Sequence, residues 1–530
     1  MRSSLLAYFL FTFVILNAQT PDRYNFIQKQ TDSSILIAWR TSLPVIGTLE
    51  WGLDSANLYN IISNPISTDK HAYELFDLTP DTKYYYRSST NTGYISAVDH
   101  FYTAKGPDQS HFSFLHYGDC GYNNSVQNTI AALMLQERAN FGIVSGDVDQ
   151  SIGNNYDVLY FDVYKDILKN YCHFTAIGNH DTYYDDAATY LDAFYLPTNN
   201  PQQSERYYSF IWGNAKFICL DSNIPYTEGS DQYAWLLDEL KCNNQQWLFV
   251  FFHHPPWTNA WSADYFIPFT DYFLYQGNVD MRTQLVPLFE QYDVDFVLNG
   301  HSHCYQRGQL NGVKYVISGG AGSATMDFNT NSNSPNIDTE IYTNQYVRFN
   351  IDSDTATYVC INSAGDVIDS VFTQKLNWTP FEIAISAAND SLYASNGVTY
   401  QWFLDGNPIF GATDSVYFPT TNGNYQVEVT NSKGCTFLSD IFALFNVSLG
   451  EWSKNIQIYP NPAQHYVIID NLTEVSGEIL VTDMYGKAIS NFKMNSNSKL
   501  QLDIDQLSDG LYFIRIITPF GEMVERVIIN

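Results

Sequence analysis

The sequence predicts a multidomain protein in which an α/β layered domain is flanked by β-sandwich domains. Its 530 residues are too many for one hydrophobic core, so several domains are expected. Aromatic residues make up 16% of the chain and charged residues 15%, which is typical of folded β-rich or mixed domains. Short β-type runs dominate both ends, whereas apolar β-runs and helical patterns alternate over residues 108–375.

The N-terminal residues are typical of an export signal. Met1 and Arg2 precede an apolar run from Leu5 to Leu16, which is too short to span a bilayer comfortably, and Ala18 offers a small residue before a cleavage point. We therefore predict a signal peptide over residues 1–18, in preference to an uncleaved anchor. We expect no transmembrane segment in the mature chain, because no later apolar run is long enough.

Residues 21–105 are expected to form a small β-sandwich. Ile35, Ile37 and Trp39 keep the two-residue period of a strand. The segment from Leu78 to Arg87 resembles the corner of fibronectin type III modules, in which a Leu-x-Pro-x-Thr-x-Tyr sequence enters a strand. The resemblance implies a fibronectin-III-like domain that flanks the domain after it.

The middle segment, residues 108–375, alternates β-runs with helical patterns such as Trp235, Leu236 and Leu240. Five of its apolar runs are followed directly by polar clusters, which is where open α/β sheets present ligands. In chain order these clusters are Gly118–Gly121, Gly146–Gln150, Gly178–Asp181, His253–Pro256 and Asn299–Arg307. They contain five of the eleven histidines, and their carboxylates, amides and imidazoles together predict a two-metal site.

The last cluster shows why the clusters must be taken together. His301 and His303 follow an apolar β-run and point to one face of an extended segment. Alone, such a pair is more often a polar strand end, because imidazole also serves plain hydrogen bonding. The four upstream clusters favour metal ligation instead.

In this order the clusters resemble the calcineurin-like metallophosphoesterases, and within them the purple-acid-phosphatase-like branch. The motifs of that branch are Asp-x-Gly, Gly-Asp-x-x-Tyr, Gly-Asn-His-Asp/Glu, a strand followed by His, and Gly-His-x-His-x-Tyr-x-Arg. The resemblance covers about half of the chain, and Gly300, His301, His303, Tyr305 and Arg307 match the last motif in full. It implies a four-layer sandwich of two mixed sheets with helices outside over residues 108–375.

The resemblance also assigns roles to single residues. Asp147 would bridge two metal ions, and His180 would stabilise the transition state or protonate the leaving oxygen, with Asp181 orienting it. A hydroxide formed from metal-activated water would attack phosphorus. His254 would face the substrate or simply pack. The implied metal ligands are Asp119, Asp147, Asn179, His253, His301 and His303.

Two positions depart from the family pattern. Gln150 stands where purple acid phosphatases carry the iron-binding Tyr, so the charge-transfer colour is expected to be absent and the metals are left open among iron, zinc and manganese. Gln150 itself could contact metal or substrate, and Asp149 could enter the coordination. Gly121 stands where non-purple relatives carry a His ligand, so the first site is expected to have few ligands.

The C-terminal third contains two further β-rich segments. Residues 376–447 resemble an immunoglobulin-like module, with Asp405, Gly406 and Asn407 as a hairpin turn. Residues 453–530 resemble the C-terminal sorting domain of type IX secretion substrates of Bacteroidetes. The motifs that carry this resemblance are Tyr459–Pro462, Asp483–Lys487 and Leu507–Tyr512. It implies export through the type IX secretion machinery, followed by release or attachment to the cell surface.

Charge and cysteine content limit the partners. The net charge of −30 argues against a nucleic-acid polymer or an anionic membrane, since the field of the protein would repel polyanions. A small phosphate ester remains compatible because bound metal would attract it. The seven cysteines are few and odd in number, so no disulfide framework can be inferred, and Cys120 and Cys304 are expected to pack as small apolar residues.

These features predict an exported, acid-phosphatase-like hydrolase of phosphate monoesters. One alternative is a phosphodiesterase acting on nucleotides or other diesters, because the aromatic-rich loop over residues 257–280 could stack a base. The alternative from another class is a surface binding protein with a silenced phosphatase domain. The missing Tyr at Gln150 favours this alternative slightly, whereas the retained ligand types argue against it.

Overall fold

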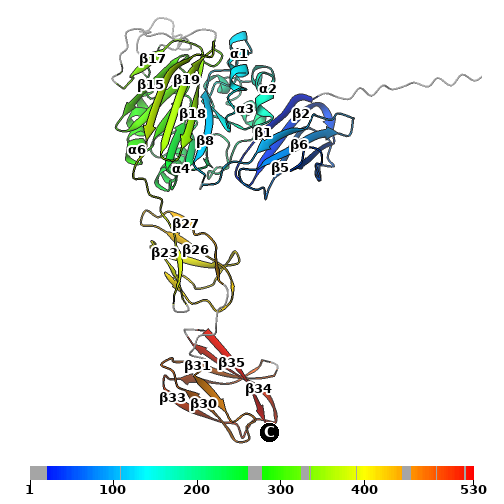
Figure 1. Ribbon diagram of the computed structural model, residues 1–530, viewed down its shortest axis with the longest axis vertical. Coiled ribbons are helices and arrows are strands. Elements are labelled where there is room, and N and C mark those ends of the chain that lie inside the picture. Colours follow the sequence, from blue (N-terminus) through cyan, green and yellow to red (C-terminus); the bar gives the residue numbers. More distant parts are fainter. Residues whose placement is uncertain are drawn as a thin grey trace, which may run out of the picture. The chain divides into compact units, whose positions relative to one another are not determined.

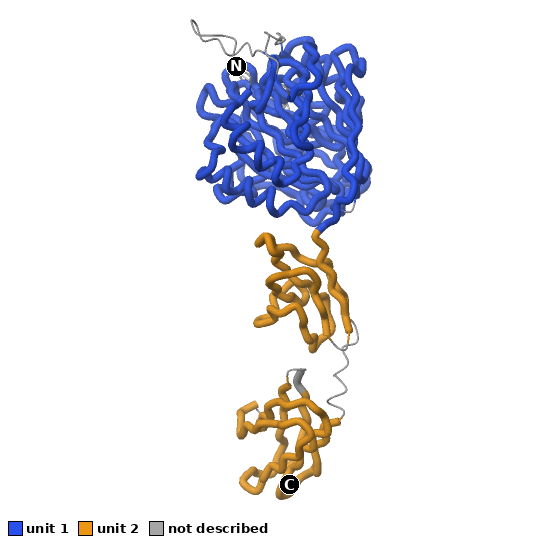
Figure 2. The backbone as a smooth tube through the Cα atoms, turned by 90° about the vertical axis from the view of Figure 1, so that its left-hand side faces the viewer, with its two compact units in different colours: residues 1–380 blue, residues 381–530 orange. Residues whose placement is uncertain are grey.

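A computed structural model gives the fold of the chain (Figure 1). It describes residues 21–107, 109–260, 277–323, 334, 336–388, 391–444, 455–484, 486–518 and 521–530. The predicted signal peptide and most of the aromatic loop over residues 257–280 lie outside these ranges. The chain divides into two compact units, Met1–Pro380 and Phe381–Asn530, which Figure 2 colours separately.

The described N-terminal part of the first unit forms two antiparallel sheets, as the sequence pattern predicts. Ile35, Ile37 and Trp39 are completely buried in β2, and Arg23 of β1 anchors the sheets to the next domain by donating to the Ala193 carbonyl over 2.6 Å. One sheet has the order β1-β2-β5, with β1 (Pro21–Gln28), β2 (Ile35–Val45) and β5 (Thr68–Leu75). The other has the order β4-β3-β6-β7, with β3 (Gly47–Gly52), β4 (Asn60–Ser63), β6 (Lys83–Thr90) and β7 (Asp99–Tyr102).

The rest of the first unit is built on two mixed sheets, which agrees with the predicted sandwich. The first has the order β10-β9-β8-β18-β19-β20, with β8 (His111–Tyr117), β9 (Phe141–Val144), β10 (His173–Thr175), β18 (Gln345–Asp352), β19 (Thr355–Asn362) and β20 (Val367–Gln374). The second has the order β11-β12-β13-β14-β16-β15-β17, with β11 (Tyr208–Trp212), β12 (Ala215–Cys219), β13 (Trp247–Phe251), β14 (Phe296–Asn299), β15 (Tyr305–Leu310), β16 (Val313–Ser318) and β17 (Thr339–Ile341).

Helices cover the outer faces of these sheets. In Figure 1, α1 and α2 lie to the right of the two sheets and α6 to the left. The helical pattern of Trp235, Leu236 and Leu240 predicted from the sequence lies in α4. The helices are α1 (Ser125–Met134), η1 (Asp157–Phe161), α2 (Asp162–Leu168), η2 (His180–Thr182), α3 (Ala188–Ala193), α4 (Asp231–Lys241), α5 (Val279–Gln284) and α6 (Val286–Gln291). Among the described residues, no helix combines the length and apolar character needed to cross a membrane.

Aromatic side chains hold the two sheets face to face. Phe114 of β8 meets Phe249 of β13 edge to face, with 5.3 Å between ring centroids, and stacks on Phe349 of β18 at 4.7 Å. Alternate residues of β13, such as Leu248 and Val250, are buried against α4, α5 and α6 instead. Because both faces of this sheet are covered at its centre, β13 is a continuous apolar run and β14 is apolar up to its last residue, and polar clusters follow at their ends.

The second unit consists of two β-rich parts, each with its own core. The predicted Asp405–Gly406 turn joins β23 to β24, and both residues have positive φ (48° and 77°), as a type I′ hairpin requires. The strands of the first part are β21 (Ile385–Ala388), β22 (Ser391–Ala394), β23 (Thr399–Leu404), β24 (Asn407–Pro408), β25 (Val416–Tyr417), β26 (Gly423–Thr430), β27 (Thr436–Leu438) and β28 (Phe442–Leu444). Those of the second are β29 (Ile456–Tyr459), β30 (Tyr466–Asn471), β31 (Gly477–Asp483), β32 (Ala488–Met494), β33 (Ser498–Asp503), β34 (Gly510–Thr518) and β35 (Gly521–Ile529).

Candidate metal centre

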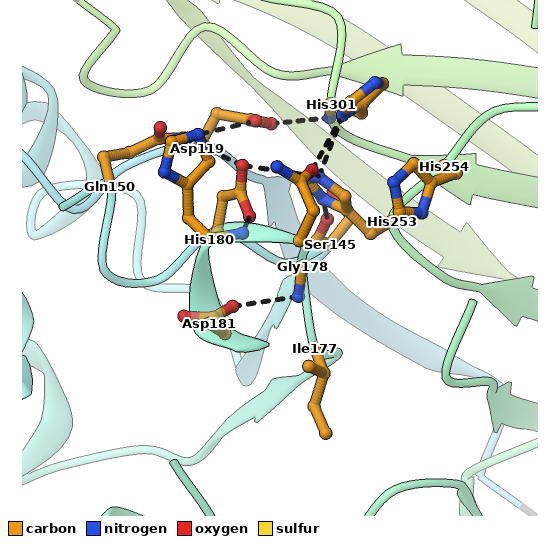
Figure 3. Close-up of polar contacts among 12 residues, drawn as sticks. Asp119, Ser145, Gln150, Ile177, Gly178, His180, Asp181, His253, His254 and His301 are labelled. Atoms are coloured by element: carbon orange, nitrogen blue, oxygen red, sulfur yellow. Dashed lines mark hydrogen bonds and ion pairs between the residues drawn. The ribbon is translucent and has the colours of Figure 1, made fainter. Parts of the chain in front are cut away.

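The five polar clusters meet at one edge of the sandwich. β8, β9 and β10 are parallel in the first sheet, and β13 and β14 are parallel in the second, so their carboxyl ends present their loops together. Figure 3 shows side chains from these loops pointing toward one another, with Asp119 and Gln150 on one side and His253, His254 and His301 on the other. The structure thus brings the predicted site residues together from positions far apart in the chain.

Two carboxylates form the centre of the site, and the backbone that carries them is unusual. Asp119 and Asp147 are completely buried, and each has a positive φ (56° and 51°), as does His301 (66°). Residues other than glycine seldom adopt this conformation, and when they do the surrounding structure must hold them in it. Here the neighbouring loops do so, since the Asp119 N–H donates to the Gly146 carbonyl (3.1 Å) and the His301 N–H to the Asp119 carboxylate (2.8 Å).

Two glycines of the motifs are required by close approach to these carboxylates. A Cβ on Gly178 would lie 2.0 Å from Oδ1 of Asp147, and a Cβ on Gly300 would lie 2.6 Å from Oδ2 of Asp119. Real Cβ atoms do not come this close to other heavy atoms, so any other residue would displace the carboxylate. These glycines therefore set the position of the two acidic side chains.

The imidazoles and one amide complete a set of converging donor atoms. His253 Nε2 lies 3.4 Å from Asp147 Oδ2 and 3.0 Å from Asn179 Oδ1. His301 Nδ1 lies 3.1 Å from the same Asn179 oxygen, and His303 Nε2 lies 3.5 Å from Asp119 Oδ1. All six residues predicted as ligands are thus brought into one site.

This donor set fits bound cations. Ligand atoms of Asp119, Asp147 and His253 all lie within 4.8 Å of one another, and those of His253, His254 and His301 form a second such group. Two carboxylates buried side by side repel each other unless positive charge lies between them. Oxygen and imidazole nitrogen are ligands that iron, zinc and manganese accept.

The electrostatics of the site follow from burial and from these carboxylates. Burial by itself would lower the pKa of His253, but the neighbouring Asp147 and Asp119 raise it to about 9. Burial and the adjacent His253 lower the pKa of His254 to about 3, and burial together with His254 and His253 lowers that of His301. The two carboxylates thus favour the positively charged form of His253.

Gln150 and Asp149 occupy different positions around the carboxylates. Gln150 Nε2 lies 3.3 Å from both Asp119 Oδ1 and Asp147 Oδ2, and its carbonyl oxygen accepts from the Tyr122 hydroxyl at 3.3 Å. The carboxylate of Asp149 accepts hydrogen bonds from the backbone of the turn that follows it, at Ser151, Asn154 and Asn155. It therefore stabilises that turn, and its entry into the metal coordination stays a prediction.

The contacts of Asp181 join two loops of the site. Its carboxylate accepts hydrogen bonds from the backbone N–H groups of Val148 (3.3 Å), Asp149 (3.1 Å) and Gly178 (2.9 Å) and from the Tyr156 hydroxyl (3.1 Å). Burial and the charge of Asp147 raise its pKa to about 7, against the effect of these donors. Asp181 therefore ties together the loops that carry Asp147 and Asn179, and its role in orienting the ring of His180 stays a prediction.

We expect Asp181→Asn to act on stability and metal uptake. An amide cannot accept from all four donors, and each buried donor left unpaired costs about 1–3 kcal/mol, so we expect a loss of about 2–4 kcal/mol in the free energy of unfolding. Denaturant unfolding of the chelator-treated full chain measures this loss. The matched control is Asp166→Asn, which removes one exposed ion pair with Lys169. Unchanged stability with reduced turnover would instead support the predicted role of Asp181 in orienting His180.

Comparison with known families and structures agrees with this geometry. A model of the family described as "Calcineurin-like phosphoesterase" matches residues 112–305. The chain contains a calcineurin-like phosphoesterase domain. A second family model, described as "Secretion system C-terminal sorting domain", matches residues 457–530, so the predicted type IX sorting domain is confirmed.

The curated relatives of the phosphoesterase domain include purple acid phosphatases from plants. Purple acid phosphatase 23 of Arabidopsis thaliana is 34% identical over 123 residues, which are 22% of this chain and 24% of the relative. The purple acid phosphatase of Glycine max is 27% identical over 270 residues, 47% of this chain and 55% of the relative. The chain therefore spans between about a quarter and about half the length of these relatives.

A solved structure shares the fold. The purple acid phosphatase PPD1 from seeds of yellow lupin (Lupinus luteus) superposes with a TM-score of 0.56 over 67% of this chain and 74% of that chain. The sequence identity is 20%, so the likeness concerns the fold of the phosphoesterase domain and not its substrate.

Sequence analysis missed several residues of the phosphoesterase domain. The Ser145 carbonyl accepts from His253 Nδ1 at 2.8 Å, which orients that ring, and the Tyr183 hydroxyl contacts Asn179. Ser145 directly precedes the Gly146 cluster and Tyr183 lies four residues after Asn179, so proximity in sequence was the available signal.

The expectations for Gly121 and for two cysteines can also be compared with the structure. No side chain fits at Gly121, because a Cβ would lie 2.1 Å from the Val148 carbonyl oxygen. Cys120 and Cys304 are buried, consistent with packing.

Proposed function

We propose that the phosphoesterase domain hydrolyses phosphate monoesters with the help of two bound metal ions. The observation that supports this most directly is the convergence of six donor side chains from five loops, and this set includes the completely buried carboxylates of Asp119 and Asp147. The similarity to purple acid phosphatases agrees with it. The metal ligands are Asp119, Asp147, Asn179, His253, His301 and His303, as the sequence predicts.

Asp147 is the proposed bridge between the two ions. One carboxylate oxygen accepts from the backbone N–H of His180 at 2.9 Å, and the other lies 3.4 Å from His253 Nε2. The Asp147 carboxylate therefore lies between two parts of the site. Asp119 and His303 form one part, and Asn179 belongs to the other. When bound, the two ions would activate water as the nucleophile and offset the negative charge of the phosphate.

His180 is the proposed group that acts on the phosphate or on the leaving oxygen. Its backbone contacts the central carboxylate, and its ring is only partly buried, with Nδ1 3.2 Å from the Ser151 carbonyl oxygen. An imidazole beside the central carboxylate can stabilise charge on the phosphoryl group or give a proton to the departing alcohol.

We also propose the identity of the metals, the flanking domains and the route of export. Iron, zinc and manganese all suit the donors, and a colourless protein is expected because Gln150 replaces the phenolate donor.

The residues 21–105 and 376–447 are proposed as fibronectin-III-like and immunoglobulin-like domains, and residues 108–375 as the phosphoesterase domain. The sorting domain, proposed to span 453–530, implies export through the type IX secretion machinery to the cell surface or the medium.

A phosphodiesterase and a silenced binding protein are the alternatives that the sequence leaves open. The relatives found are named as phosphatases, and the ligand set is retained, so neither alternative is favoured. The aromatic loop that suggested a diester substrate lies mostly outside the described residues.

Metal removal and replacement test the proposed function. We expect chelation of the purified full chain to abolish hydrolysis of p-nitrophenyl phosphate, and addition of iron, zinc or manganese to restore it without a visible absorption band. Bis-p-nitrophenyl phosphate is assayed in parallel. Faster cleavage of the diester would move the assignment to phosphodiesterase, and absence of both metal and turnover would favour the binding protein.

A further inference from the structure

Tyr183 contacts two of the proposed functional side chains, although no motif points to it. Its hydroxyl oxygen accepts a hydrogen bond from Asn179 Nδ2 at 2.7 Å, and its ring lies 4.8 Å from the ring of His180 between centroids. The side chain is 55% exposed, so it does not serve the hydrophobic core. Its position is therefore better explained by these two contacts than by packing.

Local backbone structure produces this arrangement. Asn179, η2 (His180–Thr182) and Tyr183 have helical dihedral angles, and the Tyr183 N–H donates to the His180 carbonyl at 3.3 Å. Side chains four residues apart on a helical turn lie on the same side, so the Tyr183 ring extends back over Asn179. The spacing Asn-x-x-x-Tyr thus places a phenol beside the amide.

The amide of Asn179 has two chemically different ends, and only its oxygen can ligate a cation. That oxygen points into the site, 3.0 Å from His253 Nε2 and 3.1 Å from His301 Nδ1, while the NH₂ group is directed outward to the Tyr183 hydroxyl. A ligand that is already held in its binding orientation loses less conformational entropy when the ion binds.

We propose that Tyr183 is a positioning residue that holds the Asn179 amide in its metal-binding orientation. This inference rests on the proposed two-metal function and adds a residue that the family motif does not contain. Loss of an outer hydrogen-bond partner typically weakens metal affinity by about 10- to 100-fold. The effect should be confined to the ion that Asn179 binds, because the Asp119 and His303 side does not depend on this turn.

The test is a metal titration of the chelator-treated full chain with Zn²⁺ and, separately, Mn²⁺, in competition with a chromophoric chelator. We expect Tyr183→Phe to raise the dissociation constant of one of two ions by about 10-fold and to leave the other within about twofold. Asn179→Ala identifies the ion concerned. Tyr184→Phe is the matched control, because Tyr184 is the adjacent tyrosine and is 59% exposed.

The outcomes separate this inference from the proposed function. A merely structural role for Tyr183 would lower the unfolding midpoint of the metal-free chain and leave the two affinities unchanged. Equal affinities in the wild type and Tyr183→Phe, with two ions bound and hydrolysis retained, would overturn the inference alone. A wild-type chain that binds neither zinc nor manganese would overturn the inference together with the proposed site.

Discussion

Replacing Asp147 by Asn is expected to reduce phosphate-ester hydrolysis by at least about 10³-fold, because bound metal contributes several kcal/mol of transition-state stabilisation. Asp147 is completely buried at the centre of the donor set, and an amide brings no negative charge to hold two cations. Elemental analysis should show that the bound metal falls from two ions per chain to one or none. Steady-state assays with p-nitrophenyl phosphate measure the loss of turnover.

The control for this variant is Asp69→Asn, which makes the same chemical change on an exposed residue of β5. It should keep both metal and activity. A variant Asp147→Asn that retained two ions and more than a tenth of the activity would exclude Asp147 as the bridge. If the protein were a binding protein with a silenced phosphatase domain, Asp147→Asn would leave its binding intact.

Replacing His180 by Ala is expected to have the second largest effect, and its size should depend on the leaving group. General acid catalysis contributes about 10²- to 10⁴-fold, and a poor leaving group needs the proton most. We therefore expect a loss of about 10³-fold with an alkyl phosphate and of only about 10-fold with p-nitrophenyl phosphate, whose phenolate leaves without a proton. The bound metal should remain unchanged, because His180 is not among the ligands.

His111→Ala is the control for the His180 variant, since His111 is an exposed histidine of β8 that lies beside the exposed Asp352. Equal losses of about 10²-fold with both substrates would assign His180 to stabilisation of the phosphoryl oxygens instead of proton donation. Full activity of His180→Ala with both substrates would remove it from the catalytic residues.

The sequence was sufficient for the fold class of the central domain and for the residues of the proposed metal site. Apolar runs such as Phe112–Tyr117 and Trp247–Phe252 end in polar clusters because both faces of the sheets are covered and only the strand ends are free for polar side chains. This pattern is local, so it can be detected in the sequence. The same holds for α4, whose apolar residues keep the helical period, and for the Asp405–Gly406 hairpin.

Only the tertiary structure decided what each polar side chain does. The His301 N–H contacts the Asp119 carboxylate across 182 positions of sequence, and Asp181 accepts from the loop of Asp147 across 33 positions. The motif suggests only that Asp181 orients His180, whereas its contacts in the structure show that it also holds two loops together. The Tyr183 contact with Asn179 spans four residues. Its proposed role in positioning the amide depends on the imidazoles that contact the oxygen of the same amide.

There is a physical reason why the sequence predicts the strands and helices but not the role of each polar side chain. Strand and helix formation depends on the burial of neighbouring residues with a short period, which the order of residues records directly. The role of a carboxylate or an amide depends on which donors from other loops surround it, and these are brought together only when the two sheets pack. The sequence therefore determined the ligand types and their strands, whereas the packing of the loops determined which side chains face the metal centre and which support it.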